Sequence, residues 1–170
     1  YTEVKNQKEK LEKQAKIINE DLKLAKKIQM SFFDQKLPEF KKFDISSLFI
    51  PMIEVGGDFY DFYISRKDED SKFGILITDT SGHGIQAAFI TSMIKATFEN
   101  NFIRRFLNSS DKVLELLNKE LYDKLAGNFI TAQYCVLDLN EYYAYLSSAG
   151  HNPLIIVRDR KIIRYSVKGK

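Results

Sequence analysis

The stretch FGILITDTSGHG, residues 73–84, decides the fold because it joins a strand, a turn and a helix in one short run. The apolar run 73–77 predicts a buried strand over residues 73–78. Asp79 follows it, and the glycines at positions 82 and 84 allow a sharp turn into the helical pattern that begins at Gly84. A carboxylate between a strand and a glycine turn is well placed to hold a divalent cation.

A second acidic segment, VGGDFYD at residues 55–61, lies about twenty residues upstream. Asp58 follows the Gly-Gly pair and opens a strand predicted over 58–64. No cysteine and no pair of histidines accompanies these carboxylates, and hard oxygen ligands favour magnesium or manganese over zinc. Asp58 and Asp79 therefore predict the start of a two-metal site for phosphoryl chemistry.

The remaining periodicity predicts an α+β fold. Further strands are expected at 43–50, 129–137, 142–147, 154–157 and 161–165, and helices at 84 to about 106 and at 111–126. The residues expected to face the core are Ile85, Ala88, Phe89, Met93 and Ala96 on the first helix, and Val113, Leu114, Leu117, Leu121 and Leu125 on the second. Strands, then two helices, then hairpin-like strands predict antiparallel sheets covered by helices.

Residues 1–36 differ in kind from the rest and are interpreted as an N-terminal coiled-coil or linker helix. A heptad seam contains Val4, Leu11, Ala15, Ile18, Leu22, Ala25 and Phe32, with Lys8 and Gln29 as polar interruptions. This pattern predicts a homodimer through residues 1–32, with a frayed linker helix as the alternative. A flanking set, Ile17, Leu24 and Ile28, is expected to pack on the globular part near Leu37-Pro38, where the helix must end.

Composition is typical of a cytoplasmic domain. The 170 residues are 44% hydrophobic, carry a net charge of +3, and include no apolar stretch long enough to span a bilayer and no visible signal peptide. The small charge argues against nucleic acid as a partner. The single cysteine, Cys135, excludes an internal disulfide and is interpreted as a buried strand residue.

Four motifs in order, GGDFYD, DTSGHGIQAAFITSMIKA, NFITAQYCVLD and SSAGHNPLII, resemble the SpoIIE/RsbU branch of the PPM-type (type 2C-like) serine/threonine protein phosphatases. The resemblance runs from about Ala25 to about Val157. It implies a sandwich of two antiparallel sheets flanked by helices, and a phosphatase domain over residues 37–170. It also implies two Mn²⁺ or Mg²⁺ ions, with Asp79 as the bridging ligand, the Thr80 backbone carbonyl beside it and Asp58 in the same cluster.

The activity implied by the resemblance is hydrolysis of phosphoserine or phosphothreonine by a metal-activated water. The substrate of this branch is commonly an anti-anti-sigma protein of a partner-switching pathway, and an upstream sensor domain is expected. The chain would then act in the cytoplasm, on its own or as the cytoplasmic part of a membrane-bound sensor.

The acids at the other end of the family's domain are missing. A Thr/Ser-Asp-Gly segment and a closing acidic pair, each of which supplies a metal-site aspartate, do not occur after Ala149. Two carboxylates leave two divalent ions underneutralised, so the chain is expected to be a C-terminally incomplete domain that binds metal weakly and has little or no activity. The spare acids, Asp61, Asp138 and Asp159, are interpreted as turn or surface residues.

The chain contains two histidines, and each follows a glycine within a motif. His83, beside the predicted metal turn, is a candidate general acid or phosphate-orienting residue, and His151 is interpreted as a structural turn residue. The segment GGDF resembles the hairpin of diguanylate cyclases but lacks its glutamate. The stronger alternative is a catalytically degenerate phosphatase-like module that binds a regulatory protein and dimerises through its N-terminal helix.

Overall fold

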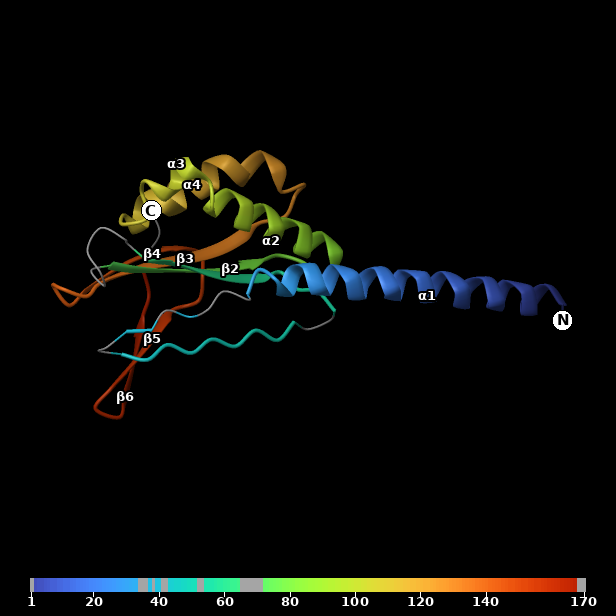
Figure 1. Cartoon of the computed structure of the whole chain (residues 1–170), viewed down its shortest axis with the longest axis horizontal. Coiled ribbons are helices and arrows are strands. Elements are labelled where there is room, and N and C mark those ends of the chain that lie inside the picture. Colours follow the sequence, from blue (N-terminus) through green and yellow to red (C-terminus); the bar gives the residue numbers. More distant parts are fainter. Residues whose placement is uncertain are drawn as a thin grey trace.

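The computed structural model describes residues 2–33, 37, 39–40, 43–51, 54–64 and 72–167. Its elements, labelled in Figure 1, follow the order helix, strands, helices, strands. They are α1 (Thr2–Met30), β1 (Asp58–Ile64), β2 (Lys72–Thr80), α2 (Ile85–Phe98), α3 (Asn101–Arg104), α4 (Ser110–Leu121), the 3-10 turn η1 (Tyr122–Lys124), β3 (Ile130–Asp138), β4 (Tyr143–Ala149), β5 (Leu154–Arg158) and β6 (Lys161–Tyr165). None of these helices is both long and apolar enough to cross a membrane.

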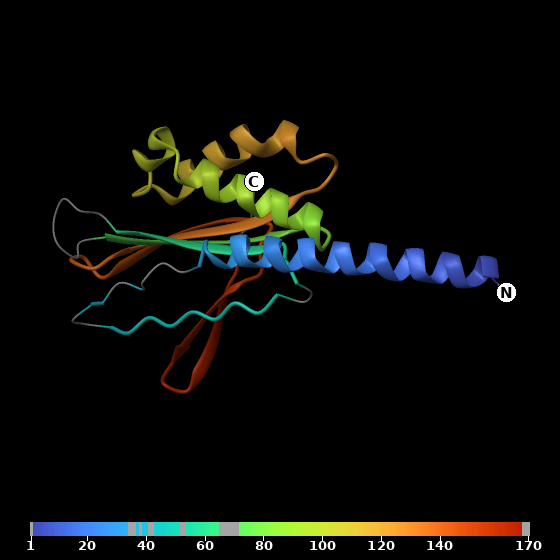
Figure 2. The same cartoon turned by 45° about the vertical axis from the view of Figure 1, so that its right-hand side comes forward.

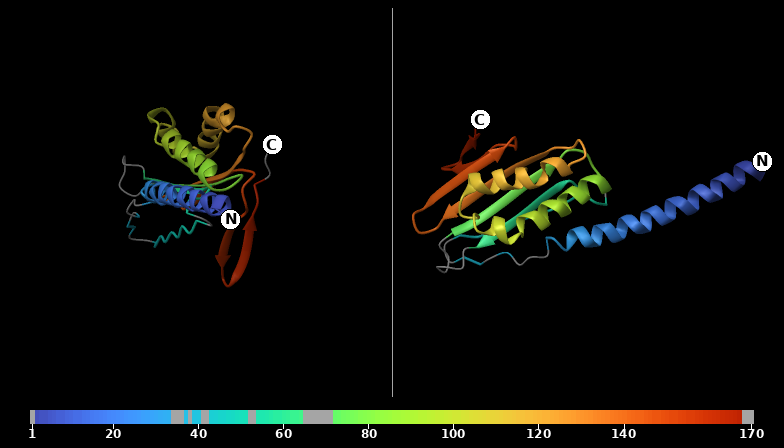
Figure 3. Two further views of the ribbon diagram at one scale, coloured as in Figure 1. Left: turned by 90° about the vertical axis from the view of Figure 1, so that its right-hand side faces the viewer. Right: turned by 90° about the horizontal axis from the view of Figure 1, so that it is seen from above.

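Four strands form one antiparallel sheet in the order β1-β2-β3-β4. Helices α2 and α4 lie over one face of this sheet (Figure 3). Strands β5 and β6 form a separate antiparallel hairpin that projects from the opposite side (Figure 2) and packs against none of the other described helices and strands. The predicted α+β class, with antiparallel sheets and helices, is confirmed.

The core lies between the four-stranded sheet and the helices. Its fully buried members include Phe59 and Leu76 from the sheet and Ile94 from α2. The Tyr134 side chain packs directly on Gly74, because a Cβ atom at position 74 would collide with the Tyr134 hydroxyl group. That hydroxyl donates to the Leu107 carbonyl at 2.8 Å, and burial raises the pKa of Tyr134. The contact ties β3 to the loop between α3 and α4.

The second predicted helix is correct in position and face, whereas the first is not. Val113, Leu114, Leu117 and Leu121 are buried as expected, with Leu125 partly buried. The predicted helix at 84–106 instead divides into α2 and α3, and it buries Ile90, Ile94 and Phe98 while Ile85 and Phe89 are exposed. Helix α2 carries apolar residues on every side, so periodicity could not decide which side meets the sheet.

Residues 43–51 are extended but form no strand, so the strand predicted at 43–50 is wrong. Leu48 and Ile50 are largely exposed. A strand is defined by the ladder of a neighbour, and in the described part of the chain this segment has none. The other predicted strands are confirmed within two residues of the observed ends.

Helix α1 ends at Met30, short of the predicted stop near Leu37, and its N-terminal part extends away from the body (Figure 1). The flanking residues Ile17, Leu24 and Ile28 are exposed, so the expectation that they pack on the globular part is wrong. Gln29, predicted to be a polar interruption of the seam, is instead the buried anchor.

The Gln29 side-chain amide bridges two parts of the body. Its Nε2 donates to the Gly56 carbonyl at 2.7 Å and to the Thr91 hydroxyl at 2.9 Å, and its Oε1 accepts from the Gly56 backbone N–H at 2.9 Å. Because buried polar groups must be paired, these bonds fix the C-terminal turn of α1 to both the Gly-Gly segment and α2.

Candidate active site

The two predicted carboxylates meet at one end of the sheet. Asp58 is the first residue of β1, and it is the direct cross-strand partner of Asp79 on β2. Side chains of directly opposed residues in an antiparallel pair point to the same face. Both residues are exposed on the face away from α2 and α4, since their neighbours Phe59, Thr78 and Thr80 are buried beneath the helices. The pairing that the sequence predicts is therefore present.

The charges of this pair favour a bound cation. Partial burial raises the pKa of Asp58, and repulsion from Asp79 raises it further, while the charge of His151 acts in the opposite direction. In the described part of the chain, no group of three or more His, Cys, Asp or Glu side chains is placed to hold a metal. The donors present are thus two carboxylates and nearby backbone carbonyls, a hard oxygen set that fits Mg²⁺ or Mn²⁺.

Gly57 brings the two acidic segments into contact. The Thr80 backbone N–H donates to the Gly57 carbonyl at 3.1 Å, and a Cβ added at Gly57 would lie 2.8 Å from the Thr80 carbonyl oxygen. Any larger residue at position 57 would push the Thr80 carbonyl away, so this close approach requires glycine. Within the described residues, the buried Thr80 hydroxyl has no hydrogen-bond partner. Thr80, the expected carbonyl ligand, therefore lies directly beside the segment that carries Asp58.

The glycine turn between β2 and α2 is held in a defined shape. Gly82 and Gly84 have φ values of 91° and 73°, which residues other than glycine rarely adopt. The Ser81 N–H donates to the Phe129 carbonyl at 2.9 Å, and the Ser81 hydroxyl accepts from the Phe129 N–H at 2.9 Å. His83 is exposed on this turn. His83 is therefore accessible to solvent, a few residues after Asp79 in the sequence.

A further pair of residues extends the site beyond the sequence prediction. Thr131 on β3 is the direct cross-strand partner of Asp79. Its hydroxyl lies 2.8 Å from Nδ1 of His151, which is partly buried. From the sequence, His151 is predicted only to be a turn residue, and Thr131 carries no prediction. The one available signal was the position of His151 in the fourth motif, because a contact across twenty residues leaves no local pattern.

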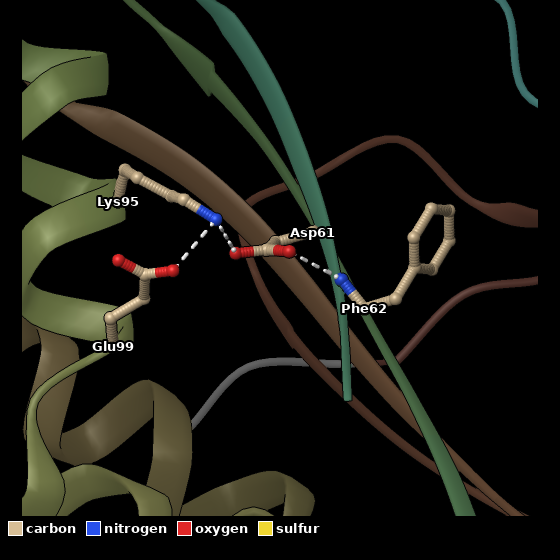
Figure 4. Close-up of polar contacts among 4 residues, drawn as sticks. All are labelled: Asp61, Phe62, Lys95 and Glu99. Atoms are coloured by element: carbon tan, nitrogen blue, oxygen red, sulfur yellow. Dashed lines mark hydrogen bonds and ion pairs between the residues drawn. The ribbon is translucent and has the colours of Figure 1, made fainter. Parts of the chain in front are cut away.

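Asp61 does not belong to this site, although only two residues separate it from Asp58. It points toward α2, where its carboxylate accepts from the Lys95 ammonium at 2.9 Å and from the Phe62 N–H at 2.8 Å (Figure 4). Lys95 also pairs with Glu99 at 3.0 Å. Asp61 is only 4% exposed, so its interpretation as a turn or surface residue is wrong.

Of the other two spare acids, Asp159 is an exposed turn residue as predicted, whereas Asp138 is the buried last residue of β3 and only its hydrogen bonds reach the turn. Asp138 accepts from the backbone N–H groups of Asn140 and Glu141 at the β3–β4 turn. These bonds, chiefly the one from Glu141, hold the pKa of Asp138 below its usual value. Asp159 lies at the tip of the β5–β6 hairpin with φ of 51°. Neither acid accompanies Asp58 and Asp79.

Replacing Asp58 by Asn is expected to stabilise the metal-free protein slightly at neutral pH. Because the pKa of Asp58 is raised in the folded state, ionisation costs stability above that pKa, and the cost disappears below the usual aspartate pKa. The gain should be under about 1 kcal/mol, since water screens an exposed pair. Thermal melts in EDTA should show it at pH 7 but not at about pH 3. A variant that melts lower at pH 7 would contradict this account.

Comparisons with known proteins give a consistent family and fold. Residues 69–169 match the family model described as Stage II sporulation protein E (SpoIIE). The chain is 28% identical over 154 residues to the phosphoserine phosphatase RsbU of Bacillus subtilis, and 29% identical over 140 residues to the phosphoserine phosphatase RsbP of the same organism. These alignments cover 90% and 79% of this chain, but only 44% and 33% of the two relatives.

Among solved structures, the SiaA-PP2C domain of Pseudomonas aeruginosa matches with a TM-score of 0.71 at 20% identity. The match covers 89% of this chain and 61% of that one. At this identity the likeness concerns the fold alone, and it agrees with the predicted type 2C-like arrangement of antiparallel sheets and helices.

Proposed function

This chain belongs to the Stage II sporulation protein E (SpoIIE) family, and from that premise we propose that it is the phosphatase domain of a metal-dependent serine/threonine phosphoprotein phosphatase. The observation that carries the proposal is the cross-strand pair Asp58–Asp79, exposed on one face beside the Thr80 segment. Two phosphoserine phosphatases among the relatives support the substrate class. We propose that residues 37–170 form the phosphatase domain and residues 1–36 a linker helix.

In this proposal, the carboxylates of Asp58 and Asp79 and the Thr80 carbonyl hold the cations. When bound, Mn²⁺ or Mg²⁺ supplies activation of a water molecule and neutralises charge on the phosphate. Asp79 lies on β2, which is flanked by β1 and β3, whereas Asp58 lies on the edge strand β1, so Asp79 would be the more central of the two ligands. His83, on the exposed turn, is a secondary candidate for donating a proton or orienting phosphate.

The chain's cysteine does not offer a competing covalent mechanism. Cys135 is buried in the middle of β3, as predicted. Burial raises the pKa of its thiol, which disfavours the thiolate that would act as a nucleophile. The chemistry is therefore assigned to the exposed carboxylates.

The test is phosphate release from phosphoserine and phosphothreonine peptides by the full-length protein in Mn²⁺ or Mg²⁺, with EDTA as the control. The proposal expects release that stops in EDTA. Peptide binding without release in either metal would favour the alternative, a degenerate module that binds a regulatory protein without turnover.

The substrate protein and the control of this domain are proposed from the family to which the chain belongs. We propose that the substrate is a small phosphorylated anti-anti-sigma protein in the cytoplasm and that an upstream sensor controls the domain. Within the described residues, Asp58 and Asp79 are the two carboxylates paired at this site, so we expect weak cation binding and slow phosphopeptide hydrolysis if no other acid joins them.

Within residues 1–32, we propose a parallel homodimer through the part of the seam that precedes Gln29, since Gln29 is buried against the body and Phe32 packs against the core. Val4, Leu11 and Ile18 are exposed along α1, and a dimer seam would bury them. Ile18→Glu should therefore convert the dimer to a monomer in sedimentation experiments. Asn19→Glu, which adds the same charge beside the seam at an exposed position, should leave the mass unchanged. A wild-type protein that is monomeric at tens of micromolar would refute the dimer.

A further inference from the structure

Three adjacent strands place a row of side chains across one face of the sheet. Asp58 on β1 is opposite Asp79 on β2, and Asp79 is opposite Thr131 on β3. Opposed residues share a face, so the Thr131 hydroxyl lies on the same side as both carboxylates. His151 contacts that hydroxyl and extends the row. The influence of the His151 charge on the pKa of Asp58 is consistent with this placement.

The turn that carries His151 is fastened to β3 at consecutive residues. The three contacts are Thr131 with His151 at 2.8 Å, a parallel bridge between Ala132 and Gly150, and a hydrogen bond at 3.3 Å from the Gln133 amide to the Asn152 carbonyl. Gly150 has φ of 67°, a conformation that favours glycine at this point. The imidazole is thus presented from a fixed backbone, as a group that contacts substrate requires.

The contact with Thr131 occupies Nδ1 of His151 and leaves Nε2 as the other nitrogen of the ring. The Thr131 hydroxyl has one proton and two acceptors within reach, Nδ1 of His151 at 2.8 Å and the Asp79 carbonyl at 3.5 Å. In the tautomer where the Thr131 hydroxyl donates along the shorter contact to Nδ1, the neutral ring carries its own proton on Nε2. The charged ring also carries a proton there. In both forms Nε2 is a donor, which can bind an oxygen anion but cannot ligate a cation.

We infer that His151 contacts the substrate, with its Nε2–H donating a hydrogen bond to a phosphoryl oxygen while Thr131 holds the ring in place. This inference rests on the proposed phosphatase function. A phosphomonoester that approaches Asp58 and Asp79 meets two negative charges, which cations held by these residues would offset. A fixed donor on the other side of the row would stabilise the charge that develops on the phosphoryl oxygens.

Two substitutions separate the two ring nitrogens. The amide of His151→Asn can occupy the position of Nδ1 and keep the Thr131 contact, but it leaves nothing at Nε2. The longer His151→Gln can place an amide N–H near the position of Nε2. For the full-length protein in Mn²⁺, we expect kcat/KM with a phosphoserine peptide to fall about 10²-fold for His151→Asn. His151→Gln should retain more activity, and calorimetric Mn²⁺ affinity should be unchanged in both variants.

Inorganic phosphate provides a readout that does not depend on turnover. Its binding, measured by calorimetry in Mn²⁺, should weaken about tenfold or more in His151→Asn and less in His151→Gln. A histidine that only holds the turn predicts the reverse order, because Asn keeps the Thr131 bond and Gln loses it. Any result in which Gln does not exceed Asn, or in which Mn²⁺ affinity falls in both, overturns the inference.

The two proposals can fail separately. If wild-type protein releases no phosphate from peptides, the proposed function fails, and the order of the two variants in phosphate binding still decides the role of His151. If wild type releases phosphate and the variants equal it in turnover and in phosphate binding, only the His151 inference fails.

Discussion

Asp79→Asn is expected to lower phosphoserine hydrolysis by the full-length protein at least about 10²-fold, roughly 3 kcal/mol of transition-state stabilisation. Asp79 lies on β2 between Asp58 and Thr131, so its carboxylate is central to the row of side chains across the sheet. Asparagine keeps the shape of the side chain and removes its charge. The loss should therefore come from cation binding, with the fold intact.

The matched comparison is Asp58→Asn, whose effect on turnover should be smaller because Asp58 stands on β1 at the end of the row. Rates should be measured across a Mn²⁺ titration, so that weaker metal binding is separated from slower chemistry. Normal turnover by Asp79→Asn at every Mn²⁺ concentration would remove Asp79 from the site.

Asp61→Ala should lower the free energy of unfolding by about 3 kcal/mol, because it leaves the Lys95 ammonium buried without its closest partner. The two side chains are 5% and 11% exposed, so water cannot replace the lost carboxylate. Glu99 still pairs with Lys95, which places the expected cost at the lower end for a broken buried pair. Urea unfolding followed by circular dichroism measures the change.

A double-variant cycle isolates the pair. Lys95→Met should be destabilising alone, and the combination of Asp61→Ala with Lys95→Met should cost less than the sum of the two changes. Glu99→Gln, at a partner that is 46% exposed, should change stability by less than about 1 kcal/mol. Strict additivity would show that the contact in Figure 4 contributes no coupling energy.

Local patterns predicted much of the fold. The runs that begin at Asp58 and at Lys161 became β1 and β6 with the expected ends, because each lies between clear turn signals. Helix α4 has one apolar stripe, and that stripe is buried. The buried face of α2 could not be predicted, since Ile85 and Phe89 are as apolar as Ile90 and Ile94 and only the sheet selects between them.

In the candidate site, too, local features could be predicted from the sequence and long-range contacts could not. The proximity of Asp58 and Asp79 could be predicted, because strand ends and glycine turns are visible in the local sequence, and their role as metal ligands stays a prediction. The roles of Gln29 and Asp61 depend on partners on α2, which are distant in the sequence, and a polar residue gives no sign of whether its partner will be protein or water. The contact between Thr131 and His151 likewise depends on the return of the chain after β4.

The most direct test of the metal site is calorimetric titration of Mn²⁺ into full-length wild type, Asp79→Asn and Asp159→Asn. Asp159 loses the same charge at the tip of the β5–β6 hairpin, where asparagine tolerates the backbone conformation. The account predicts that wild type and Asp159→Asn bind Mn²⁺ alike, whereas Asp79→Asn binds at least about tenfold more weakly. Equal Mn²⁺ affinity in all three proteins would contradict it.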